Sequence, residues 1–450
     1  MGRLFGTDGV RGEFGRDLTV DLARDLGRAA VPVLRRHEHE RPRFVIGRDT
    51  RASGVALEAA LVEGITAAGG DVMLAGVVPT PAVAFLTTGL KAGAGIVISA
   101  SHNPPKDNGI KFFGPFGYKL SDEIEDEIED EIASEGGVPG GGRVLPIPAD
   151  APDYLAHVVG AAEARLDGMK VVVDCANGAA SAFAPEALRR LGAQVRPIHD
   201  APDGSNINVG CGALHPEVVA EAVKATGADV GVAHDGDADR ALFADAEGNV
   251  IDGDQVLAAS AIEMKAAGGL PGDLVVSTVM ANLGFRRAMQ EHGIRVVEAP
   301  VGDRYVLERM LEHGAVLGGE QSGHLIFREH ATTGDGLLTA VRFLSLAARR
   351  GVPVAEVAAA MRRFPQVVVN VRVERREDLR EAAGVWKAVR AVEAELDGAG
   401  RVLVRASGTE PLVRVMVEAE SIELARRYAR ALASVVHRAL GPASGTSGGT

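Results

Sequence analysis

The chain has 450 residues, which at the usual domain size indicates about three or four domains. Hydrophobic residues make up 46% and charged residues 24% of the sequence, as in ordinary globular proteins, so a fibrous or disordered chain is excluded. The net charge of −13 and the aromatic content of 4% argue against a general nucleic-acid binder, which needs basic surface and stacking side chains.

The sequence carries no sign of a membrane or secretory protein. No apolar run reaches the roughly 18–20 residues that a membrane helix needs, and the N-terminus lacks the apolar core of a secretory signal. Cys175 and Cys211 are too few for a disulfide framework, which favours a reducing compartment. We therefore expect a cytoplasmic protein with no membrane and no nucleic-acid partner.

Short runs rich in Val and Ile alternate with stretches of helical period, which is typical of layered α/β domains. The sequence predicts strands at 44–46, 71–74, 95–98, 170–173, 194–196, 229–233 and 273–278. It predicts helices at 20–34, 54–68, 182–191, 216–226 and 282–292. After residue 365 the pattern changes, with strands expected at 366–373, 401–405 and 413–418 and a long helix at 421–440.

These changes of pattern predict domain boundaries. An acidic segment with Ile124, Ile128 and Ile132 four residues apart reads as a helix with one apolar stripe, and a Gly-rich linker follows it. We expect three similar mixed α/β domains and a C-terminal α+β lid domain around one central cleft. The expected ranges are 1–150, 151–252, 253–365 and 366–440, with a disordered tail at 441–450.

The segment DGDADR begins where the apolar run 229–233 ends. Asp235, Asp237 and Asp239 line one side of an extended chain or a tight loop, and like charges this close repel unless a cation neutralises them. An EF-hand is excluded, because Arg240 stands where glycine is needed and Ala246 where glutamate is needed. The sequence predicts a Mg²⁺ or Ca²⁺ site; the alternative is a polar turn in which the aspartates cap the backbone.

The segment SASHNPP follows the expected strand 95–98, at the edge of the sheet where α/β proteins bind ligands. Ser101 is placed there to carry a phosphoryl group. Neighbouring residues of an extended segment point opposite ways, so Ser101 and His102 form no dyad by adjacency, and no G-x-S-x-G elbow exists in the chain. The alternative is a polar loop without chemistry.

Two further segments suggest anion and polyol binding. In RASGTEP, Arg405 is followed by Ser407, Gly408 and Thr409, whose N–H groups and hydroxyls predict a phosphate nest; the alternative is a plain connection between strands. In GGEQSGH, Glu320, Ser322 and His324 alternate, and on an extended segment they project together toward a polyol.

Three basic residues beside glycine-rich turns, Arg11, Lys111 and Arg304, are each as typical of a surface charge as of a site. Neither a Walker A sequence nor a complete G-x-G-x-x-G is present. The phosphate-binding segments therefore serve something other than a P-loop nucleotide.

Taken together and in chain order, which is SASHNPP, DGDADR, GGEQSGH and RASGTEP, the four segments resemble the α-D-phosphohexomutase superfamily. The resemblance covers essentially the whole chain, and the stretches FGTDGVRG, GDRYV and GEQSGH are most similar to the branch that acts on glucosamine phosphates. It implies three α/β domains of similar topology, a fourth lid domain, and one cleft to which each domain contributes a loop.

The resemblance also implies roles for residues. Ser101 carries a covalent phosphate, and together with Asp235, Asp237 and Asp239 it holds one Mg²⁺ per chain. The implied catalytic residues besides Ser101 are Lys111, Arg240, Arg11 and His102. The implied sugar-binding residues are Glu320, Ser322, His324, Gly302 and Arg304. The implied phosphate-binding residues are Arg405, Ser407, Gly408, Thr409 and Arg414.

The activity implied is interconversion of glucosamine 6-phosphate and glucosamine 1-phosphate through a 1,6-bisphosphate, which feeds UDP-N-acetylglucosamine and cell-wall precursor synthesis. The partner is a small phosphosugar, and the protein is a monomer or a homodimer. Alternatives are a phosphomannomutase/phosphoglucomutase with the same chemistry and a non-catalytic phosphosugar-binding regulator. The general base stays open, because Asp303 occupies a position where other hexomutases can carry histidine.

Overall fold

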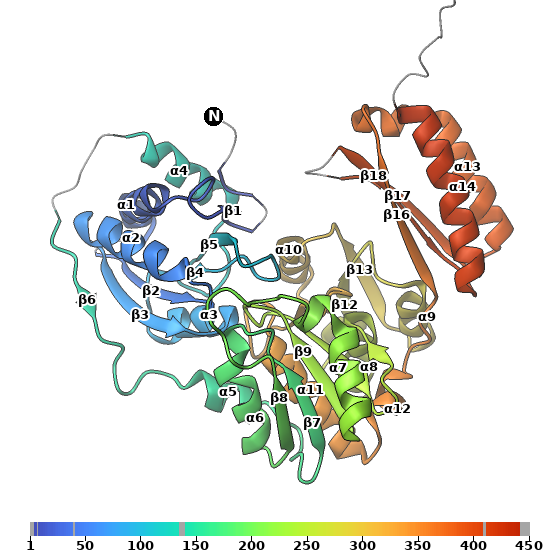
Figure 1. Cartoon of the computed structure of the whole chain (residues 1–450), viewed down its shortest axis with the longest axis horizontal. Helices are drawn as coiled ribbons and strands as arrows, with labels where there is room; N and C mark the ends of the chain where they lie inside the picture. The colour runs from blue at the N-terminus through green and yellow to red at the C-terminus, as the bar shows by residue number, and fades with distance from the viewer. Residues whose placement is uncertain (1–3, 7, 39–40, 135–139, 408–410, 442–450) are drawn as a thin grey trace, which may run out of the picture. The chain divides into compact units, whose positions relative to one another are not determined.

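The computed structural model describes residues 4–6, 8–38, 41–134, 140–407 and 411–441. The chain divides into two compact units, Met1–Met280 with His292–Ala360 and Ala281–Glu291 with Met361–Thr450. Within the described residues the strands form four separate sheets, which Figure 1 shows in chain order by colour. Three sheets with helices between their strands and one antiparallel sheet with two long helices confirm the predicted fold class.

The first sheet has six strands in the order β1-β5-β4-β2-β3-β6. Strands β4, β2, β3 and β6 run parallel, while β5 is antiparallel to both β1 and β4. Its elements are β1 (Val10–Glu13), α1 (Val20–Glu38), β2 (Arg43–Arg48), α2 (Gly54–Ala67), β3 (Asp71–Val77), α3 (Thr80–Gly89), β4 (Ala94–Ile98), β5 (Asp107–Phe113), α4 (Asp122–Ile132) and β6 (Val144–Leu145).

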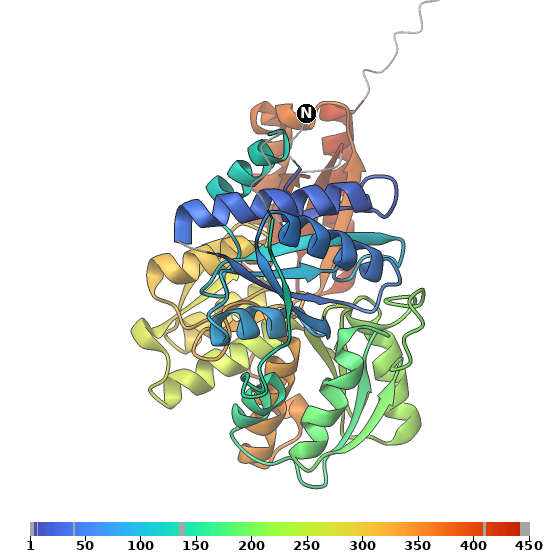
Figure 2. The same cartoon turned by 90° about the vertical axis from the view of Figure 1, so that its left-hand side faces the viewer.

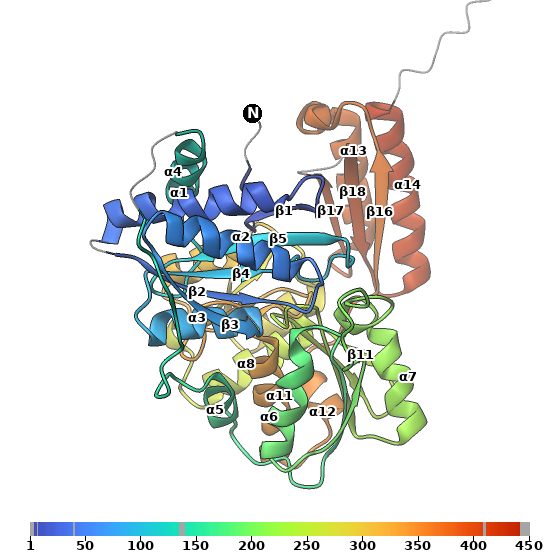
Figure 3. The ribbon, with the colours of Figure 1, turned by 60° about the vertical axis from the view of Figure 1, so that its left-hand side comes forward.

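Helices cover both faces of this sheet. Phe44 and Ile46 of β2 belong to the apolar core shared with α1 and α2, and Val45 between them points to the opposite face, where α3 packs. Figures 2 and 3 show α1 and α2 side by side over the sheet. The two helices touch closely at Gly64, where a Cβ would lie 2.0 Å from the carbonyl oxygen of Arg24. The predicted acidic helix is confirmed as α4, with Ile128 fully buried.

The second sheet has five strands in the order β11-β10-β9-β7-β8. Strands β9, β7 and β8 are parallel, and β10 returns antiparallel to β9. Its elements are α5 (Tyr154–Gly160), β7 (Lys170–Asp174), η1 (Ala179–Ala182), α6 (Ala184–Arg190), β8 (Gln194–Ile198), η2 (Gly212–Leu214), α7 (Pro216–Thr226), β9 (Val230–His234), β10 (Ala241–Asp245) and β11 (Val250–Ile251).

The third sheet has four strands in the order β13-β12-β14-β15. Its elements are α8 (Gly253–Ala266), η3 (Pro271–Asp273), β12 (Leu274–Thr278), β13 (Arg295–Ala299), α10 (Asp303–His313), β14 (Leu317–Gly319), β15 (Leu325–Phe327), α11 (Gly336–Arg350) and α12 (Val354–Ala358). Helix α9 (Leu283–Glu291) lies between β12 and β13 in sequence but groups with the C-terminal unit. The side chain of Asn282, just before α9, holds the backbone of Phe364 through two hydrogen bonds of 2.9 and 3.0 Å.

The second unit carries the fourth sheet, whose three strands are all antiparallel in the order β16-β18-β17. Its other elements are β16 (Gln366–Arg372), η4 (Arg376–Glu381), α13 (Ala383–Leu396), β17 (Arg401–Ala406), β18 (Leu412–Glu418) and α14 (Ile422–Leu440). Val413, Val415 and Val417 of the central strand pack into one core with α13 and α14. The predicted tail lies almost wholly outside the described residues.

Among the described residues, no helix is both long enough and apolar enough to cross a bilayer. The exact domain boundaries and the arrangement of all four domains around one cleft stay predictions.

Candidate active site

Three of the predicted segments lie in the first unit, each just after a strand. Ser101 follows β4, the aspartate loop follows β9, and Glu320 follows β14. Lys111 lies within β5, which pairs with β4. The ends of α/β strands are where such sheets bind ligands, and the contacts below show which of these side chains the fold brings together.

Ser101 is buried, with 1% of its surface exposed. Its Oγ donates a hydrogen bond of 2.6 Å to Oδ2 of Asp235. Its backbone has a φ of 51°, in the left-handed region that non-glycine residues seldom adopt. The sequence predicted that Ser101 and His102 point opposite ways, but this turn leaves Oγ 3.4 Å from Nδ1 of His102. That prediction assumed an extended segment and is wrong.

Arg51, which is fully buried, fixes the loop that carries Ser101. Its guanidinium donates to the carbonyl oxygens of Ser101 at 3.1 Å and Asn103 at 2.8 Å, and to Oδ2 of Asp49 at 2.9 Å. Asp49 also accepts a hydrogen bond of 2.6 Å from Ser99 Oγ, which in turn accepts the Ser101 N–H at 2.9 Å. A planar cation with five donors thus holds the backbone of Ser101 in place.

Asp235, Asp237 and Asp239 line a tight loop and are all buried. One carboxylate oxygen of each lies within 4.8 Å of the others. The loop closes through a hydrogen bond of 3.1 Å from the Ala238 N–H to the Asp235 carbonyl, with Ala238 at a φ of 60°. A Cβ at Gly236 would lie 2.6 Å from the carbonyl oxygen of Ser101, so this glycine allows the two loops to touch.

The three carboxylates have different electrostatic surroundings. Burial, Asp239 and Asp237 raise the pKa of Asp235 well above its usual range. Burial would also raise the pKa of Asp237, but Lys111, whose Nζ lies 2.9 Å from Oδ2, holds it below its usual range, helped by a hydrogen bond of 2.7 Å from Thr80 Oγ1. Repulsion within the loop is therefore only partly relieved by the protein itself.

The residues present fit a hard divalent cation. Oδ1 of Asp237 and Oδ1 of Asp239 are buried and have no hydrogen-bond partner among the described residues. Buried carboxylate oxygens without partners are costly, and these two, close to the carboxylate of Asp235, form an all-oxygen ligand set of the kind that Mg²⁺ takes. Ser101 Oγ, 2.6 Å from Asp235, lies at the edge of this group. The acidic group consistent with metal binding is thus present; the identity of the metal stays a prediction.

The cations predicted beside Ser101 meet in one place. Lys111 contacts Asp237 and, at 3.2 Å, Asp8, and Asp8 also pairs with Arg11. The Nε of Arg240 lies 3.9 Å from Asp235 and 3.7 Å from Asp239.

Burial of Lys111 is outweighed by Asp237 and Asp8, which raise its pKa. Burial, Arg240 and Arg11 lower the pKa of His102 to about 4, so this imidazole is neutral at pH 7.

Residues 320–324 form the turn between β14 and β15, so the predicted extended segment is wrong. The Gly323 N–H bonds the Glu320 carbonyl at 3.0 Å. Oε1 of Glu320 accepts the N–H of Gly302, the residue before α10, at 3.1 Å. The buried Oγ of Ser322 has no hydrogen-bond partner among the described residues.

His324 faces the aspartate loop at residues 235–240, the candidate metal loop. Its Nε2 accepts the Gly334 N–H at 3.1 Å, which places the ring proton on Nδ1, 3.5 Å from Oδ2 of Asp239. Burial opposes protonation, but Asp239 and Asp303 raise the pKa of His324.

The remaining predicted sugar-binding residue, Arg304, is engaged elsewhere. Its guanidinium lies 2.7 Å from Asp122 and 3.4 Å from Glu125, both on α4, and 3.2 Å from Glu308. These ion pairs hold the start of α10 against α4.

The predicted phosphate-binding residues belong to the second unit. Arg405 of β17 and Arg414 of β18 are directly opposite each other in the antiparallel register. Burial and then Arg414 lower the pKa of Arg405, whose Nε has no hydrogen-bond partner among the described residues. Ser407 follows Arg405 at the strand end, and Gly408 and Thr409 lie outside the described residues. Two opposed guanidinium groups favour an anion between them.

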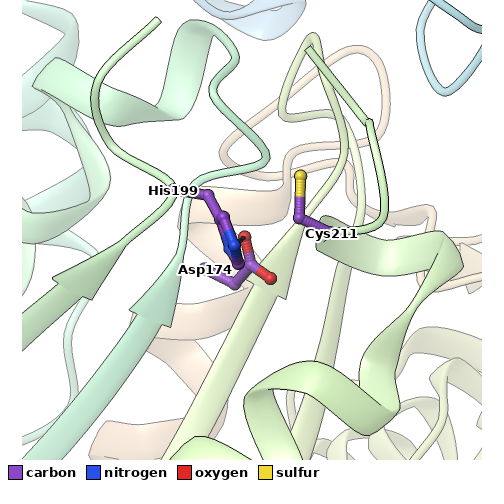
Figure 4. A group of neighbouring side chains, drawn as sticks. All are labelled: Asp174, His199 and Cys211. Carbon is purple, nitrogen blue, oxygen red and sulfur yellow. Dashed lines mark hydrogen bonds and ion pairs between the residues drawn. The ribbon is translucent and has the colours of Figure 1, made fainter. Parts of the chain in front are cut away.

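A second group has metal-ligand side chains: Asp174 at the end of β7, His199 just after β8 and Cys211 just before η2 (Figure 4). Asp174 Oδ1 accepts the Ala176 N–H at 2.9 Å and faces Nδ1 of His199 at 3.1 Å, while Oδ2 accepts the Gly212 N–H at 2.9 Å. Burial and Asp174 raise the pKa of Cys211 to about 12, so its thiol is protonated at pH 7. We interpret this group as a hydrogen-bonded bracket between loops.

That bracket supports the serine loop. Asn208 lies in the segment just before Cys211, and its Nδ2 donates to the carbonyl oxygens of Ser101 at 2.8 Å and Asn103 at 3.1 Å. The segment between β8 and η2 thereby holds the same two backbone carbonyls as Arg51.

Sequence reasoning missed several residues that hold the site together: Asp8, Asp49, Arg51, Thr80, Lys119 and Asn208. Asp49 and Arg51 had a signal, because they follow β2 as Ser101 follows β4. Asp8 lies within FGTDGVRG, a stretch on which the family resemblance rests. Thr80, Lys119 and Asn208 carried no local signal, since their partners are far away in sequence.

Comparison with known proteins agrees along the whole chain. The phosphoglucomutase/phosphomannomutase family models match domain I at residues 2–137, domain II at 152–248, domain III at 252–364 and the C-terminal domain at 368–435. A phosphoglucomutase/phosphomannomutase family protein from Burkholderia thailandensis has a structure with a TM-score of 0.82 at 28% identity, covering 97% of each chain.

Curated relatives of nearly the same length are more similar in sequence. The phosphoglucosamine mutase of Symbiobacterium thermophilum is 52% identical over 98% of this chain and 100% of its own. That of Thermobifida fusca is 54% identical over 97% of this chain and 98% of its own. The chain therefore belongs to the phosphoglucomutase/phosphomannomutase family, the phosphohexomutases, and within it to the phosphoglucosamine mutases.

Proposed function

We propose that the protein interconverts glucosamine 6-phosphate and glucosamine 1-phosphate, with Ser101 as the residue that carries the transferred phosphoryl group. The observation that supports this most directly is the hydrogen bond of 2.6 Å between Ser101 Oγ and Asp235, inside a buried group of three carboxylates. A hydroxyl joined to a cation site is what phosphoryl transfer needs, because the reaction depends on positioning and charge stabilisation.

The reaction has two balanced transfers. Phosphorylated Ser101 gives its phosphoryl group to the free hydroxyl of the sugar monophosphate, whose proton ends on the released Oγ of Ser101, so a sugar 1,6-bisphosphate and a free serine hydroxyl result. After the sugar turns around, Ser101 Oγ accepts the other phosphoryl group, and the isomeric monophosphate leaves. The serine ends as it began, and no water or nucleotide is consumed.

The proposed cofactor is one Mg²⁺, held by Asp235, Asp237 and Asp239 together with the phosphoryl oxygens on Ser101. When bound, it would neutralise charge on the phosphoryl group. Lys111, Arg11 and Arg240 add positive charge on the protein's side of the site, and Asp8 keeps two of them oriented. Neutral His102 stands 3.4 Å from Ser101 Oγ and adds no charge of its own.

The sugar is proposed to bind at the turn after β14, where Glu320 and the unpartnered Oγ of Ser322 offer hydrogen bonds to its hydroxyls. The phosphate that is not reacting is proposed to bind the C-terminal unit through Arg405, Ser407 and Arg414, together with Gly408 and Thr409. Because the sugar must turn between the two transfers, this grip must be released and remade.

The test is intact-mass analysis of the phosphorylated protein. We expect one added phosphate on a peptide containing Ser101, and its loss when glucosamine 6-phosphate is supplied. A phosphate that persists with every hexose and hexosamine monophosphate would contradict the proposal and favour a binding protein. Rates with glucosamine, glucose and mannose phosphates decide the sugar; a large preference for glucose 1-phosphate would assign a phosphoglucomutase instead.

A further inference from the structure

Lys119 has no part in the function proposed above, yet it lies between the two groups of residues that the reaction must align. It follows β5 on a short hairpin, closed by a hydrogen bond of 2.7 Å from the Gly114 N–H to the Tyr118 carbonyl. Thr332, which follows β15 of the third sheet, anchors the same hairpin by donating to the Gly117 carbonyl at 2.6 Å. The backbone that carries Lys119 is therefore fixed from two sides.

The ammonium group of Lys119 pairs with two carboxylates that are far apart in the sequence. One is Asp303, the first residue of α10, and the other is Asp8, near the N-terminus. Only 12% of the Lys119 side chain is exposed, and about a fifth of each carboxylate, so solvent screens these ion pairs little.

Each carboxylate leads on to a different part of the site. Asp8 pairs with Lys111 at 3.2 Å, and Lys111 pairs with the metal-loop residue Asp237 at 2.9 Å. Asp8 also pairs with Arg11. An unbroken series of alternating charges thus runs from the start of α10 to the metal loop.

On the other side, Asp303 follows Gly302, whose N–H donates to the sugar-loop carboxylate of Glu320 at 3.1 Å. The position of Glu320 depends on the backbone at 302–303, because the Gly302 N–H bonds its carboxylate. Lys119 binds the side chain of the next residue, Asp303. Lys119 is the step at which this sugar-side contact joins the cations beside Ser101.

The start of α10 has a second attachment, which does not involve Lys119. Arg304 pairs with Asp122 and Glu125 of α4. Because these ion pairs remain when Lys119 is altered, we expect variants at Lys119 to keep α10 against α4. They should lose the alignment of the sugar loop with the cations beside Ser101.

We propose that Lys119 is a positioning residue of the reaction: through Asp303 it sets the sugar loop, and through Asp8 it sets the cations beside Ser101. It touches neither substrate nor metal and acts through these two carboxylates. The inference rests on the proposed function, since it assigns Lys119 to the alignment of a sugar hydroxyl with the phosphoryl group. A displacement of the order of 1 Å at such a site costs about 100-fold in rate.

The experiment compares five variants with the wild-type protein. Lys119→Met removes the charge and keeps the length, and Lys119→Arg keeps the charge. Asp303→Asn removes the charge of the partner, and the double variant Lys119→Met/Asp303→Asn removes both members of one pair. Lys106→Met is the matched control, because Lys106 is 65% exposed and its only ion pair among the described residues is with Glu13 at 3.5 Å. Steady-state rates, discharge of the phosphorylated protein by glucosamine 6-phosphate, and thermal melts are measured on each.

We expect Lys119→Met to lower kcat/KM by about 100-fold, with KM raised as well as kcat lowered, because both sides of the site lose their common anchor. Lys119→Arg should stay within about tenfold of wild type, and Lys106→Met should match wild type. Adding Asp303→Asn to Lys119→Met should cost much less than Asp303→Asn costs alone, since the two residues act as one pair.

Unchanged kcat and KM per folded molecule in Lys119→Met would overturn the inference, as would losses at Lys119 and Asp303 that simply multiply. If Lys119→Met does not fold, Lys119→Arg and the double variant, in which Asp8 still pairs with Lys111 and Arg11, carry the same comparison. The proposed function fails differently: wild-type protein would then show no discharge of its phosphate, whatever stands at position 119.

Discussion

The two regions that we propose to bind phosphate groups are built in opposite ways. Around Ser101 the side chains are buried and held by residues far away in sequence: Ser101 by Asp235, Asp237 by Lys111, and the serine backbone by Arg51. On strands β17 and β18 of the second unit, Arg405 and Arg414 are half-buried and face each other as like charges.

The difference matches two tasks. A bond-breaking site gains from groups that are already in place, because no reorganisation is then needed in the transition state. A site that must bind a phosphate and release it gains from like charges that repel each other when no anion is bound. These charges must also remain accessible to solvent. We infer that the first region sets the rate of transfer and the second sets the affinity, and the following changes test that division.

The largest effect should come from Ser101→Ala, which removes the proposed nucleophile. We expect turnover to fall to about 10⁻⁴ of wild type or lower, because loss of a nucleophile disables the whole catalytic unit. The control is Ser205→Ala, an exposed serine that bonds only Asp203 among the described residues. Coupled-assay rates check this; near wild-type turnover in Ser101→Ala would refute the proposed role.

Asp239→Asn should come next. We expect the Mg²⁺ concentration for half-maximal activity to rise about 100-fold, since the variant loses one of three carboxylate ligands. In metal-free buffer the same variant should melt at a higher temperature than wild type, because like-charge repulsion falls. Mg²⁺ titrations and melts are the measurements, with the exposed Asp130→Asn on α4 as control. An unchanged Mg²⁺ dependence would move the metal elsewhere.

Arg405→Met changes the second region and should have a smaller effect of another kind. We expect KM for the sugar monophosphate to rise about 10- to 100-fold, the worth of one or two charge-assisted hydrogen bonds, while kcat changes much less. Arg372→Met on the exposed side of β16 is the control. If kcat falls and KM stays constant, the division between rate and affinity breaks down.

Asp335→Asn should alter stability with the least effect on turnover. Asp335 caps α11 and accepts the hydroxyl of Tyr154 at 2.9 Å, and the next residue, Gly336, donates its N–H to the metal-loop carbonyl of Ala238 at 3.0 Å. Burial raises the pKa of Asp335 to about 6 from its ordinary 3.8. The folded protein therefore binds a proton more tightly than the unfolded chain does.

The sign follows from this order of pKa values. This carboxyl makes the protein less stable as pH rises from 4 to 6, by about 3 kcal/mol in all, and the loss persists above pH 6. Asparagine keeps the cap and cannot ionise, so the variant should lack that slope. Denaturant titrations between pH 4 and 8 measure it, with the exposed helix cap Asp153→Asn as control. Equal slopes in wild type and Asp335→Asn would contradict the expectation.

Much of the fold could be predicted because it is written in local patterns. Alternating apolar runs placed the strands of three α/β sheets, and four-residue spacing placed α4 with Ile128 inward. The aspartate loop was also local, since Asp235, Asp237 and Asp239 lie within five residues. Their convergence with Ser101, 134 positions away, followed from the rule that ligands bind at strand ends and from resemblance to a family.

What could not be predicted depends on long-range packing or on unusual backbone. Lys119 meets a carboxylate 184 positions away, and Arg51 meets carbonyls about 50 positions away, with no pattern near either residue. Glu320, Ser322 and His324 were expected to project together from an extended segment. Residues 320–324 form a turn instead, because Gly323 bends the segment back on itself at a φ of 89°. Helix α9, predicted within the third domain, groups with the C-terminal unit through contacts that no periodicity reveals.

The left-handed backbone of Ser101 implies a conflict between stability and activity. A non-glycine residue at a φ of 51° costs about 1 kcal/mol or more, whereas glycine adopts this conformation freely. Ser101→Gly should therefore be inactive and yet resist unfolding at least as well as wild type, once the lost hydrogen bond to Asp235 is accounted for. Selection for stability alone would favour glycine at this position, so the strained serine supports the proposed chemical role of Ser101.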